Sequence, residues 1–363
     1  MKHLSIYRCL FAFTLLLTIS CSEKEDIESN TIIVCGNQEP TKATRQAYYT
    51  KPSGERVFLK SDYVNTYVND MVQVGDDIYC VGTAWNSADF KRAVYWKNGE
   101  PTYMTDGRHN ASAMQIAVDG TDVYCVGREQ TGSWHSTLTR RNEFQHYVAK
   151  CWKNGKLQYT LTKGKRSGCA TGIYIDPDHR VHIVGYDNSY IRWYQYAYER
   201  TCDARYWIDG KRQPLDISRY SSASTITGNG DKIYISGWIS NSEYDGNEKS
   251  VYWENEWRKS LSNSNDGECV FNYAQIINDN YYLCGRCEDK DFKTHGYWVN
   301  GQYIPLPTYN GSVLCIAGCG EDIYCAGNDG YAPGYWKNGK FKRLYEEPGI
   351  LTGIIVYPKT TEE

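Results

Sequence analysis

The sequence predicts an all-β fold, a seven-bladed β-propeller of four-stranded antiparallel blades that the C-terminal strand closes into a ring. Three observations carry this prediction. A Tyr-Trp pair, once replaced by Cys-Trp, is followed by a tight turn and recurs in five steps over the 240 residues from Trp96 to Trp336, a mean spacing of 48. Each repeat holds four strand-like runs, and the last run of the chain matches the first run of a repeat. Repeats of about 40–50 residues with four strands are typical of propeller blades.

The first 20 residues are predicted to be a signal peptide outside the fold. Lys2 and Arg8 belong to a basic start, and the apolar run that follows is too short for an ordinary spanning helix. The ending "LLTISC" resembles the lipobox of bacterial lipoproteins, with Thr18 where Leu is usual. That resemblance implies that Cys21 is lipidated and anchors the protein to a membrane. The alternative is an ordinary cleaved signal with a chance cysteine.

Residues 21–30 are polar and acidic and are predicted to form a short tether. An acidic stretch directly after the lipid cysteine resembles the surface-export signal of Bacteroidota lipoproteins. The resemblance implies a lipid-anchored protein on the outer face of the outer membrane. A solvated linker on a periplasmic protein is the alternative.

Residues 31–359 are predicted to form the propeller. The second strand of each repeat reads "DIYCVG", "DVYCVG", "RVHIVG", "KIYISG", "NYYLCG" and "DIYCAG". The third strand ends in Tyr-Trp or Cys-Trp, and "KNGE", "KNGK", "IDGK" or "VNGQ" follows in most repeats. Asn-Gly and Asp-Gly accept positive φ at both central turn positions, so they close two-residue hairpins.

The two ends of the chain are predicted to share one blade. "TIIVCG", residues 31–36, fits the second-strand column but has no first strand before it. "LTGIIVYP", residues 351–358, matches the first-strand run "ATGIYIDP" of residues 170–177. The C-terminal run therefore supplies the inner strand of blade 1, whose weak third strand carries Tyr49 in the Trp column, and seven blades result.

The recurring tryptophans are predicted to be wedges between blades, because strands that are apolar on both sides pack on neighbours through both faces. The pattern "VG … A-x-x-W-x-N-G … S-A-x-x-I" resembles the HAF-type repeats of bacterial extracellular proteins. This resemblance implies the architecture and leaves function open, since propellers host many activities.

The strand 2–3 and blade-to-blade connections emerge on one face of a propeller, and here they are long, whereas the other connections are short. Binding residues favour such loops. The longest insertions, residues 128–146 and 186–203, are interpreted as loops of blades 3 and 4. The predicted ligand-binding residues on these and nearby loops are Trp85, Trp134, Tyr190, Arg192, Trp193, Tyr194, Tyr196, Trp238 and Tyr244. Aromatic rings among polar groups suit sugars; the alternative is that these rings pack the loops against each other.

Charge is uneven along the chain. Residues 128–220 contain 16 Lys or Arg and 9 Asp or Glu, whereas the whole chain has a net charge of −3. An anionic ligand such as an acidic polysaccharide is one interpretation, and scattered solvated charge is the other. The near-neutral total gives no reason to expect a nucleic-acid partner.

No cofactor, metal site or catalytic residue is predicted. Twelve cysteines follow Cys21; most share strand columns with apolar residues, and their pairing is left open. Cys284 and Cys287 of "CGRC" lie three apart, on opposite faces of a strand, which argues against a redox pair. Asp70, Asn69 and Glu268 enter inner strands, but nothing pairs them as glycoside cleavage would require.

The functional hypothesis is a cell-surface lipoprotein, expected to be a monomer, that binds a carbohydrate or another extracellular ligand on the long-loop face. A protein–protein interaction scaffold is the second hypothesis, and a polysaccharide-cleaving enzyme is the third.

Overall fold

A computed structural model describes residues 30–359, except 42–43, 87–88, 136–142, 164–165, 195–196, 218–219, 241–248, 262–267, 289–292 and 309. The side chains of 132–135, 143–145, 190–194, 197–201, 268 and 288 are also outside the description. The predicted signal peptide, Cys21 and nearly all of the tether therefore lie outside the described residues. Within the described ranges there is no helix that could cross a membrane.

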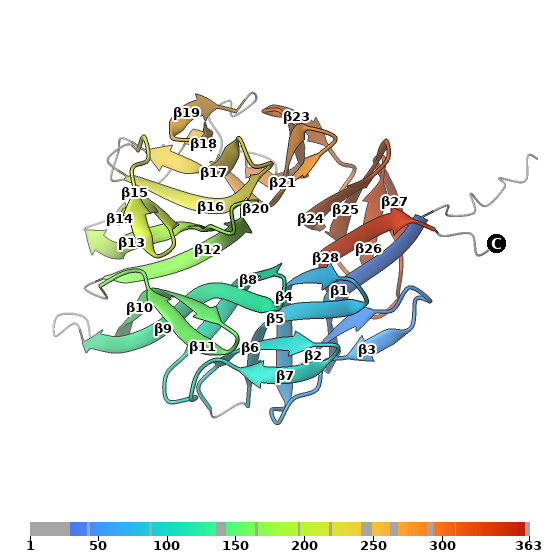
Figure 1. The fold of residues 1–363 in the computed structure, drawn as a ribbon, viewed down its shortest axis with the longest axis horizontal. Helices are drawn as coiled ribbons and strands as arrows, with labels where there is room; N and C mark the ends of the chain where they lie inside the picture. Colours follow the sequence, from blue (N-terminus) through green and yellow to red (C-terminus); the bar gives the residue numbers. More distant parts are fainter. Residues whose placement is uncertain are drawn as a thin grey trace, which may run out of the picture.

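The described residues form twenty-eight strands in seven four-stranded antiparallel sheets, and Figure 1 shows them arranged as a ring. The predicted seven-bladed propeller is confirmed.

Blade 1 contains β28 (Gly349–Pro358), β1 (Asn30–Thr41), β2 (Thr44–Thr50) and β3 (Arg56–Phe58). Blade 2 contains β4 (Asn65–Val74), β5 (Asp77–Trp85), β6 (Arg92–Lys97) and β7 (Glu100–Tyr103). Blade 3 contains β8 (Ala111–Asp119), β9 (Asp122–His135), β10 (Glu143–Lys153) and β11 (Lys156–Thr160). Blade 4 contains β12 (Ser167–Ile175), β13 (Val181–Tyr194), β14 (Ala197–Ile208) and β15 (Lys211–Gln213). Blade 5 contains β16 (Tyr220–Gly228), β17 (Ile233–Ser240), β18 (Lys249–Glu254) and β19 (Trp257–Ser260). Blade 6 contains β20 (Glu268–Ile277), β21 (Asn280–Glu288), β22 (Lys293–Val299) and β23 (Gln302–Pro305). Blade 7 contains β24 (Ser312–Cys319), β25 (Asp322–Asn328), β26 (Pro333–Lys337) and β27 (Lys340–Arg343).

Blade 1 is built from both ends of the chain, as predicted. β28 pairs with β1 along nine residue pairs, from Asn30 opposite Pro358 to Gln38 opposite Gly349. Figure 1 shows the red C-terminal strand beside the blue N-terminal one. This pairing satisfies the inner edge of β1, so the ring closes without an open strand edge there.

The tryptophan column fills the spaces between blades. The six side chains are at most 2% exposed: Trp96, Trp152, Trp207, Trp253, Trp298 and Trp336. Trp96 of blade 2, for example, packs in one cluster with Ile33 and Leu59 of blade 1. Tyr49, opposite Cys35, occupies the same register as Trp96 opposite Cys80. The predicted role of these rings as wedges is confirmed.

The Asn-Gly turns do more than reverse the chain. In blade 2, Asn98 and Gly99 have φ values of 52° and 88°, as the predicted hairpin requires. The Asn98 side-chain oxygen also accepts a hydrogen bond from the Ile78 amide at 2.9 Å, and the Asn98 amide donates to the Ile78 carbonyl at 2.8 Å. Each turn therefore ties strands 3 and 4 of its blade to the start of strand 2.

A bulge in every inner strand explains the glycine that ends "VG", "SG", "CG" or "AG". In blade 2 the bulge falls at Asn69, between Val68 and Asp70. A Cβ on Gly82 would lie only 1.9 Å from the Tyr67 carbonyl oxygen, so only glycine fits opposite this bulge. The bulged residues join blades: Asn69 Nδ2 donates to the Ala113 carbonyl of blade 3 at 2.6 Å. Thr171, Asn272 and Thr352 donate to the next blade in the same way.

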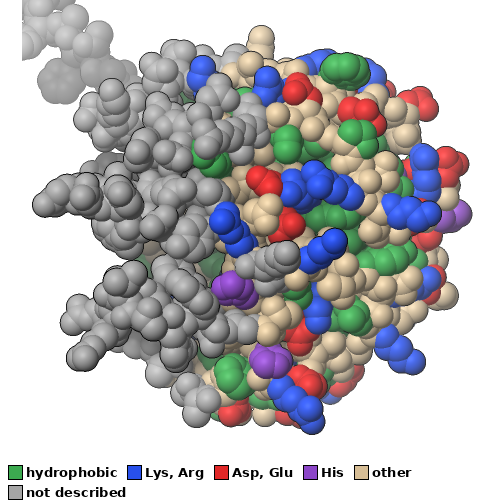
Figure 2. All heavy atoms as spheres, turned by 90° about the vertical axis from the view of Figure 1, so that its left-hand side faces the viewer, with side chains coloured by type: hydrophobic (Ala, Val, Ile, Leu, Met, Phe, Trp, Pro, Cys, Tyr) green, Lys and Arg blue, Asp and Glu red, His purple; other side chains and the backbone are tan. Residues whose placement is uncertain are grey.

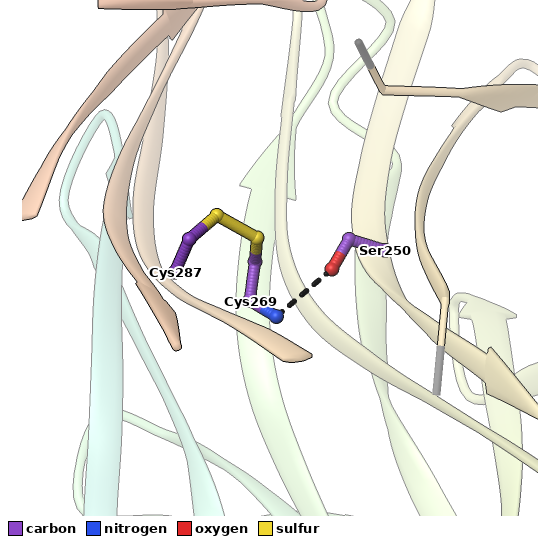
Figure 3. The surroundings of a disulfide bond; sticks show 3 residues. All are labelled: Ser250, Cys269 and Cys287. Carbon is purple, nitrogen blue, oxygen red and sulfur yellow. Dashed lines mark hydrogen bonds between the residues drawn. A yellow bond between two sulfur atoms is a disulfide. The ribbon is translucent and has the colours of Figure 1, made fainter. Parts of the chain in front are cut away.

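One disulfide links Cys269 of β20 to Cys287 of β21, which face each other directly with Cα atoms 4.1 Å apart. Figure 3 shows the bond, together with the hydrogen bond from the Cys269 amide to Ser250 of blade 5. The two cysteines of "CGRC" therefore do not pair with each other, and Cys284 is a buried thiol. Nine of the ten free thiols in the described part of the chain are buried, so these cysteines act mainly as small apolar residues.

Candidate ligand-binding face

The two segments interpreted as loops are largely strands, which corrects the sequence-based expectation. β9 and β10 pair up to His135 opposite Glu143, and β13 and β14 pair up to Tyr194 opposite Ala197. Strands 2 and 3 of these two blades are thus several residues longer than the corresponding strands of most other blades. The run "YIRWY" carries a signal for strand structure, because Tyr, Ile and Trp favour pleated strands.

The structure places two of the predicted site residues and leaves the others outside the description. Trp85 ends β5 and is partly buried, with the Lys91 amine 5.0 Å from its ring centroid. Trp238 lies within β17, is 8% exposed and packs with Tyr220. Trp238 is therefore a buried strand residue, which corrects its predicted place among the ligand-binding residues on loops. The other predicted positions lie outside the described side chains: Trp134, Tyr190, Arg192, Trp193, Tyr194, Tyr196 and Tyr244.

A cation–aromatic cluster forms the base of the two hairpins. Arg128 of β9 places its guanidinium 4.5 Å from the centroid of the Tyr147 ring. The Arg128 Nε is buried without a hydrogen-bond partner among the described residues. Tyr186 of blade 4 lies next to this cluster. Burial is the main cause that raises the pKa of its hydroxyl, and the neighbouring Cys169 adds to the increase. The contact between Arg128 and Tyr147 lies within blade 3, whereas the interaction of Arg128 with Tyr186 crosses to blade 4.

A groove of about 540 Å³ follows the boundary between blades 3 and 4. Its lining residues are Leu161, Thr162, Lys163, Asp187, Asn188, Arg205, Trp207, Gly210 and Arg212. Sequence reasoning missed the groove, because its walls come from three separate segments. Its volume falls within the roughly 300–1,000 Å³ that ligand pockets occupy.

Arg205 forms the fixed wall of the groove. It is 7% exposed, and its Nη2 donates to Asp203 Oδ2 at 2.6 Å. The same carboxylate oxygen accepts from Asn188 Nδ2 at 2.6 Å. Buried charges are tolerated when they are paired and hydrogen-bonded, so Arg205 and Asp203 are held in place before any ligand arrives.

Much of the positive charge in residues 128–220 is neutralised locally. Lys150 pairs with Glu129, and Arg180 pairs with Asp176 at 2.6 Å. These pairs support the interpretation of scattered charge for most of the segment. Figure 2 shows Lys and Arg side chains interspersed with Asp and Glu on this flank of the ring. Several lysines and arginines of the segment are exposed and form no ion pair with another described residue, and two of them, Lys163 and Arg212, line the groove.

The inner-strand carboxylates do not form a catalytic pair among the described side chains. Asp70 is 4% exposed and accepts hydrogen bonds from the Met71 amide at 2.9 Å and the Ile116 amide at 3.2 Å. Asn69 donates to the backbone of blade 3, and the Glu268 side chain is outside the description. In the part of the chain that the structure describes, no three His, Cys, Asp or Glu side chains come together as a metal site.

No protein-family model and no curated protein matches the chain. Among solved structures, the β-propeller domain of the Trilobed protease from Pyrococcus furiosus has a TM-score of 0.52 at 12% identity and covers 84% of this chain and 87% of that one. A puromycin-hydrolyzing peptidase of Mycobacterium tuberculosis has a TM-score of 0.51 at 12% identity over 84% of this chain, and this chain spans only 51% of the peptidase. Likeness at this identity shows the propeller fold alone. The Pyrococcus domain has an open velcro topology, whereas β28 and β1 close blade 1 here.

Proposed function

We propose that the protein is a lipid-anchored surface protein that binds an acidic polysaccharide in the groove between blades 3 and 4. The observation that carries this proposal is the pair Lys163 and Arg212, two exposed cations in a groove whose other cation, Arg205, is already paired. Anionic sugars present carboxylates at regular intervals, and cations without acidic partners are free to bind them. Asn188 and Thr162 add polar groups to the same walls.

The positions of the chain ends support an outward-facing binding surface. β1 starts at Asn30, opposite Pro358, on the face that carries the short strand 1–2 and 3–4 turns. Nine steps of chain separate Asn30 from Cys21, which at about 3.5 Å per residue span at most roughly 30 Å. A lipid on Cys21 would therefore attach to the short-turn side of the ring, which leaves the hairpins of blades 3 and 4 on the side opposite the attachment point.

The disulfide between Cys269 and Cys287 supports export, since such bonds persist in oxidising compartments. We expect Cys21→Ala to release the protein from the membrane fraction and to abolish incorporation of labelled palmitate. Protease treatment of intact cells then separates surface display from a periplasmic location. Membrane retention of Cys21→Ala would contradict the anchor.

Affinity electrophoresis tests the ligand. We expect gels containing polygalacturonate or alginate to retard the wild type, whereas dextran has no effect. The double variant Lys163→Ala/Arg212→Ala should bind about tenfold more weakly, from roughly 0.5–1 kcal/mol per exposed charge. Lys156→Ala/Lys340→Ala removes two exposed cations outside the groove and should bind normally.

The outcome against the proposal is equal retardation of the wild type and the groove variant, or no retardation of either. A glycan array with Trp193→Ala adds the tip of the blade 4 hairpin to the test, where equal retention by both proteins would remove Trp193 from the site. Specific capture of a protein partner without glycan binding would favour the interaction scaffold.

A further inference from the structure

A second pocket, of about 330 Å³, lies between blades 7, 1 and 2 on the face that carries the strand 2–3 and blade-to-blade connections. Its lining residues are Asn37, Glu39, Arg45, Tyr67, Asn328, Gly330, Tyr331, Pro348, Gly349 and Ile350. All of them are described, and they come from four separate segments of the chain. The volume lies at the small end of the range for ligand pockets, which suits one compact unit better than an extended chain.

Tyr331 is an exposed aromatic side chain on a rigid support. It is 59% exposed, whereas most aromatic residues of the described core are buried. Its amide donates to Asp329 Oδ1 at 3.0 Å, and its carbonyl accepts from the Gly349 amide at 3.1 Å. Asp329 is itself fixed by Arg343 at 2.5 Å. These bonds fix the backbone of Tyr331, so a ligand that stacks on the ring does not have to order the loop that carries it.

Glu39 and Arg45 supply the polar groups of the pocket. Arg45 Nε lies 2.9 Å from Glu39 Oε1, and the two side chains are 50% and 47% exposed. The guanidinium carbon lies 6.0 Å from the centroid of the Tyr67 ring, which steadies it. A guanidinium has five N–H donors and a carboxylate about four acceptor sites, so most of this capacity remains open to a ligand.

The two asparagines of the pocket form hydrogen bonds within the fold. Asn37 donates to the Val68 carbonyl at 2.9 Å and accepts from the Val68 amide at 2.8 Å. Asn328 Nδ2 donates to the Gly349 carbonyl at 3.1 Å, whereas its buried Oδ1 has no hydrogen-bond partner among the described residues. Recognition therefore falls mainly to Tyr331, Glu39 and Arg45, with Asn328 Oδ1 as a further acceptor. Because the acid and the base cancel, a neutral ligand is favoured over an anion.

We propose that this pocket binds one neutral hexopyranose unit. The apolar CH face of the sugar stacks on Tyr331, and adjacent hydroxyl groups donate to Glu39 and accept from Arg45. A single carboxylate without a partner acid assigns the pocket to binding, because glycoside cleavage uses two. This site is separate from the cationic groove of blades 3 and 4 and does not depend on it.

Saturation-transfer NMR with the methyl glycosides of glucose, galactose, mannose and N-acetylglucosamine tests the proposal. We expect at least one glycoside to bind the wild type, and Tyr331→Ala to weaken that binding about tenfold, as the loss of one stacking ring predicts. Glu39→Gln should weaken the same glycoside, because it replaces a charged acceptor of two hydroxyls by an amide.

Two controls make the result specific. Trp257→Ala removes another exposed ring, 75% exposed on β19 of blade 5, and Lys163→Ala/Arg212→Ala removes the groove cations; both should leave glycoside binding unchanged. Absence of binding by the wild type, or equal binding by Tyr331→Ala, would overturn the proposal. Polygalacturonate binding by Tyr331→Ala reports on the groove separately, so the two proposals fail independently.

Discussion

Asp70 should make the propeller less stable as the pH rises. Burial raises the pKa of this carboxyl to about 7, against 3.8 for an exposed Asp, and the amides of Ile116 and Met71 only partly oppose that effect. No Lys or Arg among the described residues pairs with it. Above pH 7 the folded protein therefore holds an uncompensated charge between blades 2 and 3.

The size of the effect follows from the shift. About 3 pKa units correspond to about 4 kcal/mol. The sign follows from linkage: the folded state binds the proton more tightly, so the stabilisation is complete below pH 4 and is lost as the pH rises through 7. Between pH 5 and pH 8, Asp70 alone should lower the free energy of unfolding by about 2–3 kcal/mol.

Urea denaturation of the wild type and Asp70→Asn at pH 5, 6, 7 and 8 measures the pH-dependent contribution of Asp70 to the free energy of unfolding. Asparagine keeps one acceptor but opposes the second backbone amide with its own NH₂, at a cost of about 1–3 kcal/mol at every pH. The variant should thus be less stable than the wild type at pH 5, and the gap should close by about 2–3 kcal/mol at pH 8. Asp62→Asn, which removes an exposed carboxylate, should show a constant gap. A gap for Asp70→Asn that is constant to within about 0.5 kcal/mol would refute the reasoning.

Three further predictions concern the blade architecture. Asn98→Gly keeps the positive φ but leaves the Ile78 amide without its side-chain acceptor, so the free energy of unfolding should fall by about 1–2 kcal/mol; an unchanged value in urea denaturation would show that the turn acts through φ alone. Trp336→Ala should cost about 3–5 kcal/mol, whereas Trp336→Phe should cost clearly less because the indole N–H is buried without a partner among the described residues. Cys269→Ala/Cys287→Ala opens a link between residues 18 apart and should destabilise by about 3 kcal/mol; thermal melting that matches the oxidised wild type would contradict this.

The blade repeat could be read from the sequence because the signals are local. The turn residues, the second-strand column and the Tyr-Trp pair lie within one hairpin of each other, and seven copies reinforce the pattern. The match between residues 351–358 and 170–177 predicted closure, and the pairing of β28 with β1 confirms it. The Trp column is also predicted correctly, because a large ring at the same position of every repeat indicates the same packing site between every pair of blades.

The candidate sites could not be read in the same way. Trp238 is predicted to lie on a loop of the ligand-binding face, but it lies within β17 and packs in a buried cluster with Tyr220. The long insertions are interpreted as loops because they connect strands 2 and 3 of their blades and exceed the usual length of such connections, yet the backbone continues as paired strands. Accessibility depends on what the neighbouring blade covers, and the local sequence does not contain that information.

The number of blades, the position of each hairpin turn and the pairing of the two chain ends follow from the sequence, since they depend on short-range backbone preferences and a repeated pattern. Three features appear only in the folded chain: Glu39, Arg45 and Tyr331 line one pocket, Cys269 bonds to Cys287, and the Asp70 carboxyl is buried away from water. Ring closure brings together residues nearly 300 positions apart, and the desolvation and partners that set their chemistry exist only after that closure.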